Sequence, residues 1–318
     1  MDRPLIIASR RSPLARLQAR EVADLIAHAH GWNGEEMSRR IRIDTFVSEG
    51  DVKLSGPLAA VGGKGLFTKE IQGPVLAGDA DIAVHSLKDM PTASPEGLVV
   101  GPTPRRADPR DCFISPKAKR LEDLPAGATV GAAALRRTAQ VLHRRPDLKV
   151  ATIRGAVQTR LRKLNEGEVD ATFLAAAGLT RMGFLDKASS ILSPDEMLPA
   201  IGQGALGIEY RAGDDRIAEA LSRIGCPETG VCVAAERAFL AALDGSCRAP
   251  IAGLARRNGR EIVFDGEVLS PDGQAVFKAK RTFVYKADDL DSARAAGEDA
   301  AAEIRAAAGP AFFDALKA

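Results

Sequence analysis

Basic side chains follow five predicted strands of this 318-residue chain. Arg10 and Arg11 come directly after the apolar run 5–9, and Lys88 follows the run 80–86. Carboxyl ends of parallel strands meet at one edge of a sheet, and the helix N-termini there already favour anions. Repeated cations at such an edge are unfavourable unless an anion binds. The other cations in such positions are Arg136, Arg137, Arg154, Arg160 and Arg181.

Arginine suits bidentate recognition of carboxylates or phosphates. We therefore predict a site for an elongated ligand with several negative charges, bound by cations from two domains. The alternative is that these cations lie on solvated helix faces. We accept that alternative for Arg144 and Arg145, which come late in their predicted helix.

One acidic residue lies among these predicted strand-end cations. Asp89, in "HSLKDMP", lies at the same predicted strand edge, where neighbouring cations favour its ionised form. A carboxylate in an anion site is suited to stabilise positive charge that develops during a reaction. The alternative is a structural ion pair with Lys88 or a nearby arginine.

A cysteine lies in the loop-like stretch "LDGSCRAPIAG", residues 243–253. The neighbours of Cys247 are glycine, serine and arginine, whereas Cys112, Cys226 and Cys232 lie in apolar contexts typical of small buried hydrophobes. With no CxxC pair and no HExxH motif, we predict no metal site.

Short apolar strands alternate with amphipathic helices through the first two-thirds of the chain, which predicts βαβ units with parallel strands. Ser12 and Pro13 are typical of an N-cap and a first helical position. Beyond about residue 225 a helix precedes two strands that flank a Pro-Asp-Gly turn, which indicates an α+β unit. The predicted strands lie at 5–9, 80–86, 128–131, 148–154 and 170–178, and the helices at 12–29, 66–78, 133–145 and 156–167.

Proline-rich stretches at 101–111 and 193–204 mark domain boundaries. We predict an α/β fold with three domains: residues 1–104 with 200–222, residues 105–199, and a smaller α+β domain at 223–318. The glycine-rich stretch 48–65 is predicted to be a lid, since long structureless loops in compact domains are usually functional. The alternative is a disordered surface loop.

Three short motifs carry little weight. "GQGALG" (202–207) follows a proline-rich segment and runs into a predicted strand, so a hinge is favoured over a nucleotide site. "VGGKG" lacks the serine or threonine of a phosphate loop. The Ser-x-Lys pair in "HSLK" is common by chance, and we expect His85 to be a satisfied core residue.

Bulk composition excludes several classes of function. The net charge is +2 and only 4% of the residues are aromatic, which argues against a nucleic-acid partner. The N-terminal apolar run is too short for a signal peptide, and no stretch approaches a membrane span. We expect a cytoplasmic protein with no membrane partner.

Seven motifs in order resemble the porphobilinogen deaminase family, also called the hydroxymethylbilane synthases. The resemblance runs from about residue 5 to 255. Its motifs are "ASRRSPLA", "VGGKGLFTKEI", "DIAVHSLKDMP", "DPRDCFIS", "LRRTAQVLHRRPDLKVATIRGAVQTRL", "LPAIGQGALGIE" and "GSCRAPIAG".

The resemblance implies a transferase of tetrapyrrole (haem and chlorophyll) biosynthesis. Such an enzyme condenses four porphobilinogen units, with loss of ammonia, into hydroxymethylbilane on a covalently attached dipyrromethane primer. It also implies two α/β domains of periplasmic-binding-protein architecture around a cleft, in a monomer. The primer would be attached to Cys247, Asp89 would be catalytic, and Lys64 and Phe67 would lie at the end of the lid. The residues that match the family's carboxylate-binding groups are Arg10, Ser12, Lys88, Arg136, Arg137, Arg154, Arg160 and Arg181.

The chain departs from the family's pattern at three places. Alanines at 132–134 replace a usual Thr-Ser-Ser, Ala156 replaces an asparagine, and Ala60 replaces a lysine. Each lost hydroxyl would remove a hydrogen bond worth about 1 kcal/mol. The three alanines leave open a degenerate paralogue that binds tetrapyrroles without building them. A separate alternative is a non-catalytic protein that binds a multiply anionic ligand in the same two-lobed cleft, which would have no need to modify Cys247.

Overall fold

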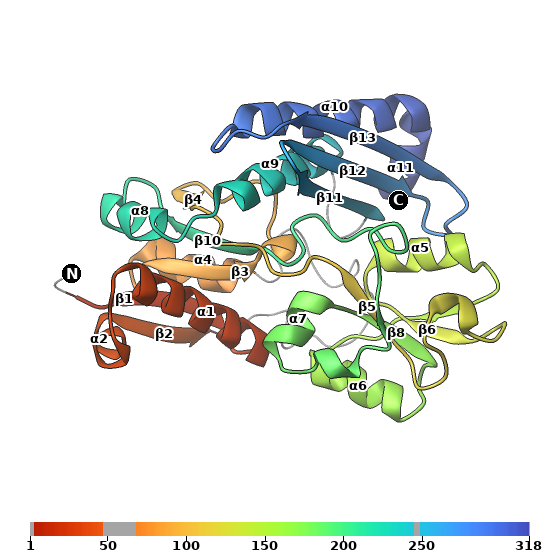
Figure 1. Ribbon diagram of the computed structural model, residues 1–318, viewed down its shortest axis with the longest axis horizontal. Coiled ribbons are helices and arrows are strands. Elements are labelled where there is room, and N and C mark those ends of the chain that lie inside the picture. Colours follow the sequence, from red (N-terminus) through yellow and green to blue (C-terminus); the bar gives the residue numbers. More distant parts are fainter. Residues whose placement is uncertain (1–2, 47–67, 245–248, 318) are drawn as a thin grey trace. The chain divides into compact units, whose positions relative to one another are not determined.

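The computed structural model describes residues 3–46, 68–244 and 249–317 of the chain (Figure 1). Within them the chain divides into two compact units. One comprises residues 3–46, 68–107 and 205–230, and the other comprises residues 108–204 and 231–317. No helix in these described ranges is long and apolar enough to cross a membrane.

The first unit is built on a five-stranded sheet in the order β2-β1-β3-β10-β4. β1 is parallel to both β2 and β3, whereas β10 runs antiparallel to its neighbours β3 and β4. The strands are β1 (Leu5–Arg10), β2 (Ile41–Phe46), β3 (Ile82–Ser86), β4 (Leu98–Val100) and β10 (Leu206–Arg211). The helices are α1 (Pro13–Ala29), α2 (Gly34–Arg40), α4 (Lys69–Ala77), the short 3-10 helix η2 (Leu87–Asp89) and α8 (Asp215–Ser222).

Apolar side chains fix two helices against this sheet. Val22 and Ile26 of α1 are fully buried in one cluster with Ile7 of β1. Ile71 of α4 lies in a second cluster with Ala83 of β3. Ser12 caps α1 as predicted, since its hydroxyl accepts a hydrogen bond from the backbone N–H of Ala15 at 3.3 Å.

The second unit contains a sheet with a closely similar plan, in the order β7-β6-β8-β5-β9. β6 is parallel to β7 and β8, and β5 is antiparallel to β8 and β9. The strands are β5 (Asp111–Ile114), β6 (Thr129–Gly131), β7 (Lys149–Ala151), β8 (Ala171–Ala175) and β9 (Ser190–Ile191). The helices are η3 (Leu121–Asp123), α5 (Leu135–Arg144), α6 (Val157–Asn165), α7 (Ala176–Arg181) and η4 (Leu185–Lys187).

The same unit holds a three-stranded antiparallel sheet in the order β11-β12-β13, and helices pack on it (Figure 1). Phe239 of α9 and Phe264 of β12 contact edge to face inside its core. The turn after β12 reaches α5, where the carbonyl of Gly273 lies 3.0 Å from Nδ1 of His143. The elements are α9 (Pro227–Ala242), β11 (Ile251–Asn258), β12 (Glu261–Leu269), β13 (Val276–Val284), α10 (Leu290–Ala308) and α11 (Pro310–Lys317).

The structure confirms the predicted fold class of two α/β modules and a smaller C-terminal α+β module. Three details were wrong. The two larger sheets are mixed rather than parallel, because β10 and β5 each enter antiparallel. The strand predicted at 148–154 ends at Ala151, and the one predicted at 170–178 ends at Ala175, where α7 begins. The division into three domains stays a prediction, and the unit boundaries fall after residues 107, 204 and 230.

Candidate active site

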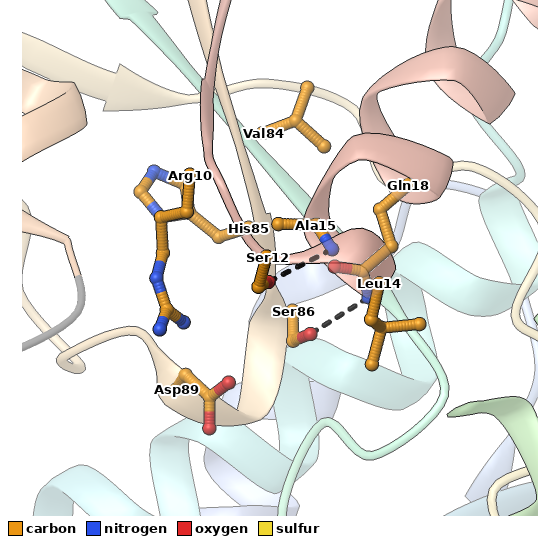
Figure 2. Close-up of a pocket in the computed structure, with 9 residues that line it drawn as sticks. All are labelled: Arg10, Ser12, Leu14, Ala15, Gln18, Val84, His85, Ser86 and Asp89. Atoms are coloured by element: carbon orange, nitrogen blue, oxygen red, sulfur yellow. Dashed lines mark hydrogen bonds between the residues drawn. The ribbon is translucent and has the colours of Figure 1, made fainter. Parts of the chain in front are cut away.

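A pocket opens at the carboxyl edge of the first sheet. β1 and β3 are parallel with Ala8 opposite Ala83, so Arg10 and His85 lie level at their ends. The first turn of α1 starts at the same edge, as Figure 2 shows. The pocket is lined by Arg10, Ser12, Leu14, Ala15, Gln18, Val84, His85, Ser86 and Asp89.

Asp89 ends η2, the 3-10 turn that directly follows β3. It is half-buried and lines the pocket, with the Arg10 side chain drawn next to it in Figure 2. Among the described residues, its carboxylate forms no hydrogen bond or ion pair. The structure therefore shows no ion pair between Asp89 and Lys88 or an arginine within the described residues.

Two polar side chains hold the walls of the pocket in place. Gln18 of α1 donates from Nε2 to the hydroxyl of Ser86 at 2.8 Å, which ties the helix to the end of β3. Ser12 uses its hydroxyl as the α1 cap, so its hydrogen-bonding capacity is already partly engaged. The predicted residues Arg10, Ser12 and Asp89 thus meet in one place, and Lys88 immediately precedes Asp89 in η2.

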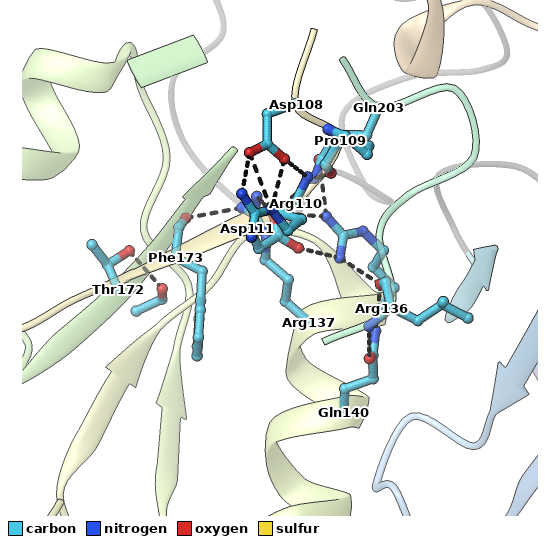
Figure 3. A network of polar contacts seen from close by, with 12 residues as sticks. Asp108, Pro109, Arg110, Asp111, Arg136, Arg137, Gln140, Thr172, Phe173 and Gln203 are labelled. Atoms are coloured by element: carbon cyan, nitrogen blue, oxygen red, sulfur yellow. Dashed lines mark hydrogen bonds and ion pairs between the residues drawn. The ribbon is translucent and has the colours of Figure 1, made fainter. Parts of the chain in front are cut away.

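The second sheet carries a buried charge cluster at its carboxyl edge (Figure 3). Asp111 starts β5 and pairs with Ala175 at the end of β8. Its carboxylate accepts hydrogen bonds from Arg136 at 2.7 Å, from Arg137 at 2.7 Å and from Gln203 at 2.9 Å. Both arginines lie in the first turn of α5 and are 5% exposed, so the alternative of a solvated helix face is wrong for them.

The cluster holds one positive charge in excess, because two guanidinium groups share one carboxylate. Burial opposes ionisation of Asp111, but the charges and hydrogen bonds of the two arginines hold its pKa well below the usual range. Nε of Arg137 is buried and has no partner among the described residues. An unsatisfied buried N–H in a cationic cluster favours an additional anionic oxygen.

Three further predicted cations follow strands of the same sheet, but each lies in a different element. Arg154 lies in the loop three residues beyond β7, not at the strand end. Arg160 lies in α6 and donates from Nε to the carbonyl of Gly155 at 2.9 Å. Arg181 ends α7, where the helix dipole favours a cation, so the argument from an unfavourable helix start fails for this residue.

Several predicted residues lie outside the described part of the chain. They include the attachment residue Cys247, the lid 48–65 with Lys64, and Phe67 and Ala60. The other cysteines fit their predicted role, since Cys112 and Cys232 are buried and Cys226 is half-buried. Burial raises the pKa of the Cys112 thiol to about 11, which suppresses its reactive thiolate.

Asp111, Gln203 and Glu209 were not among the predicted site residues. Asp111 appeared only inside a longer motif, and Gln203 only inside the glycine-rich GQGALG. Glu209 lies in β10 and has no local signal in the sequence beyond being a charged residue in an apolar strand. All three act through contacts with residues far away in the chain, which no local pattern encodes.

Comparison with known proteins places the chain in a family. Residues 5–219 match the model of the porphobilinogen deaminase dipyrromethane cofactor binding domain, and residues 231–306 match the porphobilinogen deaminase C-terminal domain. This chain belongs to the porphobilinogen deaminase family. A porphobilinogen deaminase from Nitrobacter winogradskyi is 54% identical over 307 residues, covering 96% of this chain and 94% of that protein. A chloroplastic porphobilinogen deaminase from Oryza sativa is 49% identical over 312 residues, covering 98% of this chain and 86% of its own.

The porphobilinogen deaminase family consists of enzymes of tetrapyrrole biosynthesis that make hydroxymethylbilane, which confirms the predicted class of enzyme. Solved structures with a similar fold include a periplasmic substrate-binding protein from Coxiella burnetii. It has a TM-score of 0.43 and 16% identity, and covers 71% of this chain and 93% of its own. A putative methionine-binding lipoprotein from Bacillus subtilis has a TM-score of 0.41 and 14% identity. The match covers 70% of this chain and 90% of the lipoprotein chain. At these scores the similarity says nothing of ligand or function.

The described residues fit a group that carries several carboxylates, as the family's cofactor does. The excess positive charge around Asp111 and the unpartnered Nε of Arg137 are the observations that support this fit. Two of the alanines that replace polar residues of the family lie at helix starts. Ala134 and Ala156 occupy the N-cap positions of α5 and α6, and neither helix has a side-chain cap.

Proposed function

We propose that this chain makes hydroxymethylbilane from four porphobilinogen units on a dipyrromethane attached to Cys247, with Asp89 as the catalytic carboxylate. The open carboxylate of Asp89 at the carboxyl edge of the first sheet carries the proposal. The bound dipyrromethane would supply the pyrrole carbon to which each new ring is joined. The protein is proposed to act as a cytoplasmic monomer.

The role of Asp89 follows from its charge and its surroundings. Porphobilinogen loses ammonia to give an electron-poor pyrrole whose nitrogen carries positive charge. A carboxylate fixed beside that nitrogen stabilises the charge as it develops, and it needs no reorganisation because η2 already holds it in the pocket. No described partner competes for this carboxylate.

The arginines are proposed to bind the acetate and propionate arms of the rings. Arg10 lines the pocket of Asp89, with Ser12 and Lys88 beside it, and we assign these residues to substrate carboxylates. Arg136 and Arg137 are proposed to hold a carboxylate of the dipyrromethane through the excess charge of their cluster. Arg154, Arg160 and Arg181 are assigned to the carboxylates of the growing chain.

The experiment that tests the proposal is ammonia release from porphobilinogen by wild type and Asp89→Asn. We expect the variant to lose at least 100-fold in turnover, since it removes charge stabilisation and leaves the shape of the side chain. Its melting temperature should stay close to wild type because the carboxylate has no described partner to lose.

Asp24→Asn is the matched control. Asp24 is an exposed aspartate of the same unit, in α1, where its carboxylate pairs with Arg20 at 2.9 Å. It should retain wild-type turnover. Turnover by Asp89→Asn within a few-fold of this control would remove Asp89 from the mechanism, and no ammonia release by wild type would favour the non-catalytic binding protein.

A further inference from the structure

One face of α5 is in contact with the C-terminal module, here residues 231–317. Arg136, Gln140 and His143 are spaced by four and then three residues along α5, so they lie on the same face of this helix. Arg136 belongs to the charge cluster of Asp111, and Gln140 lies one turn further along (Figure 3). This face therefore joins the arginine-bearing start of α5 to the part of the helix that the module contacts.

The turn between β12 and β13 lies directly on α5. Nδ1 of His143 lies 3.0 Å from the carbonyl oxygen of Gly273, and Nδ1 is the donor because a carbonyl oxygen only accepts. Gly273 has φ +73°, and a Cβ there would lie 2.5 Å from both the carbonyl oxygen of Ala139 and the backbone nitrogen of His143. No side chain at residue 273 fits while the turn stays on the helix.

The turn keeps its shape through hydrogen bonds of its own. The backbone N–H of Gly273 donates to the carbonyl of Ser270 at 2.9 Å, and the N–H of Ala275 donates to the Ser270 hydroxyl at 2.9 Å. Asp272 accepts from the N–H of Gln274 at 3.1 Å. The turn thus needs no partner on α5 to form, and its close approach to the helix calls for a separate reason.

A second connection runs through Leu198, which lies between α5 and β11. The side-chain amide of Gln140 donates to the carbonyl of Leu198 at 3.0 Å and accepts from its N–H at 2.7 Å. Arg136 donates to the same carbonyl at 3.1 Å. The Leu198 side chain packs in one apolar cluster with Ala252 and Leu254 of β11.

The module also binds the residues that follow Leu198. The N–H of Gly253 donates to the carbonyl of Pro199 at 3.0 Å, and the N–H of Gly202 donates to the buried carboxylate of Glu236 at 2.7 Å. Ile201 lies in the apolar core of the module itself. The module is therefore fixed to α5 at two places, the turn at Gly273 and the segment 198–202.

We propose that Gly273, His143 and Gln140 are positioning residues for the dipyrromethane, because they hold the first turn of α5 in register with the module that contains Cys247. This inference rests on the proposed function. In the sequence Cys247 falls between α9 and β11, the two elements that bind the segment 198–202. A group that is attached at one end and bound through its carboxylates at the other fits only one separation of the two ends.

The separation matters because attachment makes the binding of the carboxylates intramolecular, and the gain depends on how well the two ends match. A misplacement of about 1 Å can cost about 100-fold in rate. The three positioning residues do not touch the dipyrromethane in this scheme. A role in stability alone would lower the melting temperature equally with and without the dipyrromethane, whereas a positioning role changes the difference between the two forms.

The test uses the full-length protein made in cells that cannot form porphobilinogen, and then incubated with porphobilinogen. Intact mass measures how fast the protein gains two linked pyrrole units, and thermal unfolding measures the rise in melting temperature that accompanies the gain. We expect Gly273→Ala to gain mass about tenfold more slowly than wild type or slower still, with a rise of about half or less.

Gly259→Ala is the matched control. Gly259 has φ +62° in the turn between β11 and β12 of the same sheet, and a Cβ there meets nothing within 4 Å. The variant therefore carries similar backbone strain without a clash. It should lower the melting temperature of both forms equally and keep the wild-type rate and rise. Equal effects of Gly273→Ala and Gly259→Ala on the rate and the rise would overturn the proposal.

A milder pair of variants decides the question if Gly273→Ala fails to fold. His143→Ala removes the donor to Gly273 and should slow the mass gain about fivefold, the worth of one hydrogen bond. His143→Asn keeps an N–H donor near the position of Nδ1 and should restore the wild-type rate. Equal rates for these two variants would refute the proposal. No mass gain by wild type would refute the proposed function and this inference with it, whereas a gain that is the same in every variant refutes this inference alone.

Discussion

At the scale of single residues, Asp111 is the side chain on which the second sheet's charge cluster depends. It is fully buried and accepts from two arginines that are themselves 5% exposed. Removing one partner of a buried ion pair leaves the other charges without compensation. Asp111 therefore organises Arg136 and Arg137 before any ligand binds.

We predict that Asp111→Asn lowers the free energy of unfolding by about 3–5 kcal/mol at pH 7. Urea unfolding followed by circular dichroism measures this loss. Asp108→Asn is the control, since Asp108 pairs with Arg110 at a half-exposed position and should cost about 1 kcal/mol or less. Equal losses in the two variants would contradict the role given to Asp111.

The decrease in the free energy of unfolding caused by Asp111→Asn should also depend on pH, in a defined direction. The pKa of Asp111 is lower in the folded protein than in the unfolded chain, so its stabilisation is fully present above the unfolded pKa, about 3.9. It disappears as pH falls through the folded pKa. The difference between wild type and Asp111→Asn should thus be constant from about pH 5 to pH 8 and shrink below about pH 4. A difference that grows on acidification would contradict this assignment.

At the scale of elements, two helices that carry the arginines proposed to bind ligand carboxylates start without a side-chain cap. Ala134 has the extended backbone of an N-cap, with φ −93° and ψ 125°, but contributes no oxygen. A serine there would accept a backbone N–H of the first turn of α5.

We predict that Ala134→Ser raises the free energy of unfolding by about 1 kcal/mol, measured by urea unfolding. Ala133→Ser, one residue earlier and outside the cap position, should change it by less than about 0.5 kcal/mol. If both serines have the same effect, the gain does not come from capping.

Helix packing in the C-terminal module depends on one glycine. A Cβ at Gly297 of α10 would lie 2.1 Å from the carbonyl oxygen of Ala235 in α9, so the two backbones are in direct contact. Gly297→Ala should lower the melting temperature by several degrees, because α10 must move away from α9. Gly230→Ala in α9, where a Cβ meets nothing within 4 Å, should leave it unchanged or raise it. A Gly297→Ala protein as stable as Gly230→Ala would show that the helices can separate freely.

The sequence predicted where helices and strands occur better than which strands pair and which distant side chains contact one another. Hydrophobic periodicity gave α1 and β3 to within two residues, and the Ser12–Pro13 start of α1 is confirmed. The antiparallel direction of β5 and β10 in their sheets was not predicted, because strand direction is set by pairing between distant segments. The Asp111 cluster and the contact between His85 and Glu209 were missed for the same reason: their members are 25 to 124 residues apart in the chain.

At the scale of the whole molecule, family membership covers both parts of the chain, with matches at residues 5–219 and 231–306. Two α/β sheets each bring cations to their carboxyl edge, and the net charge is still only +2. Cations therefore gather at these two sheet edges although the chain as a whole is close to neutral. The proposed attachment of the primer to Cys247 links this arrangement to the chemistry.

The intact mass of the denatured protein, followed by peptide mapping, tests that link most directly. We predict an excess equal to two linked pyrrole units, located on the peptide that contains Cys247, and no excess in Cys247→Ser. The same excess on a peptide with another cysteine, or an unmodified protein that stays unmodified after incubation with porphobilinogen, would contradict the account.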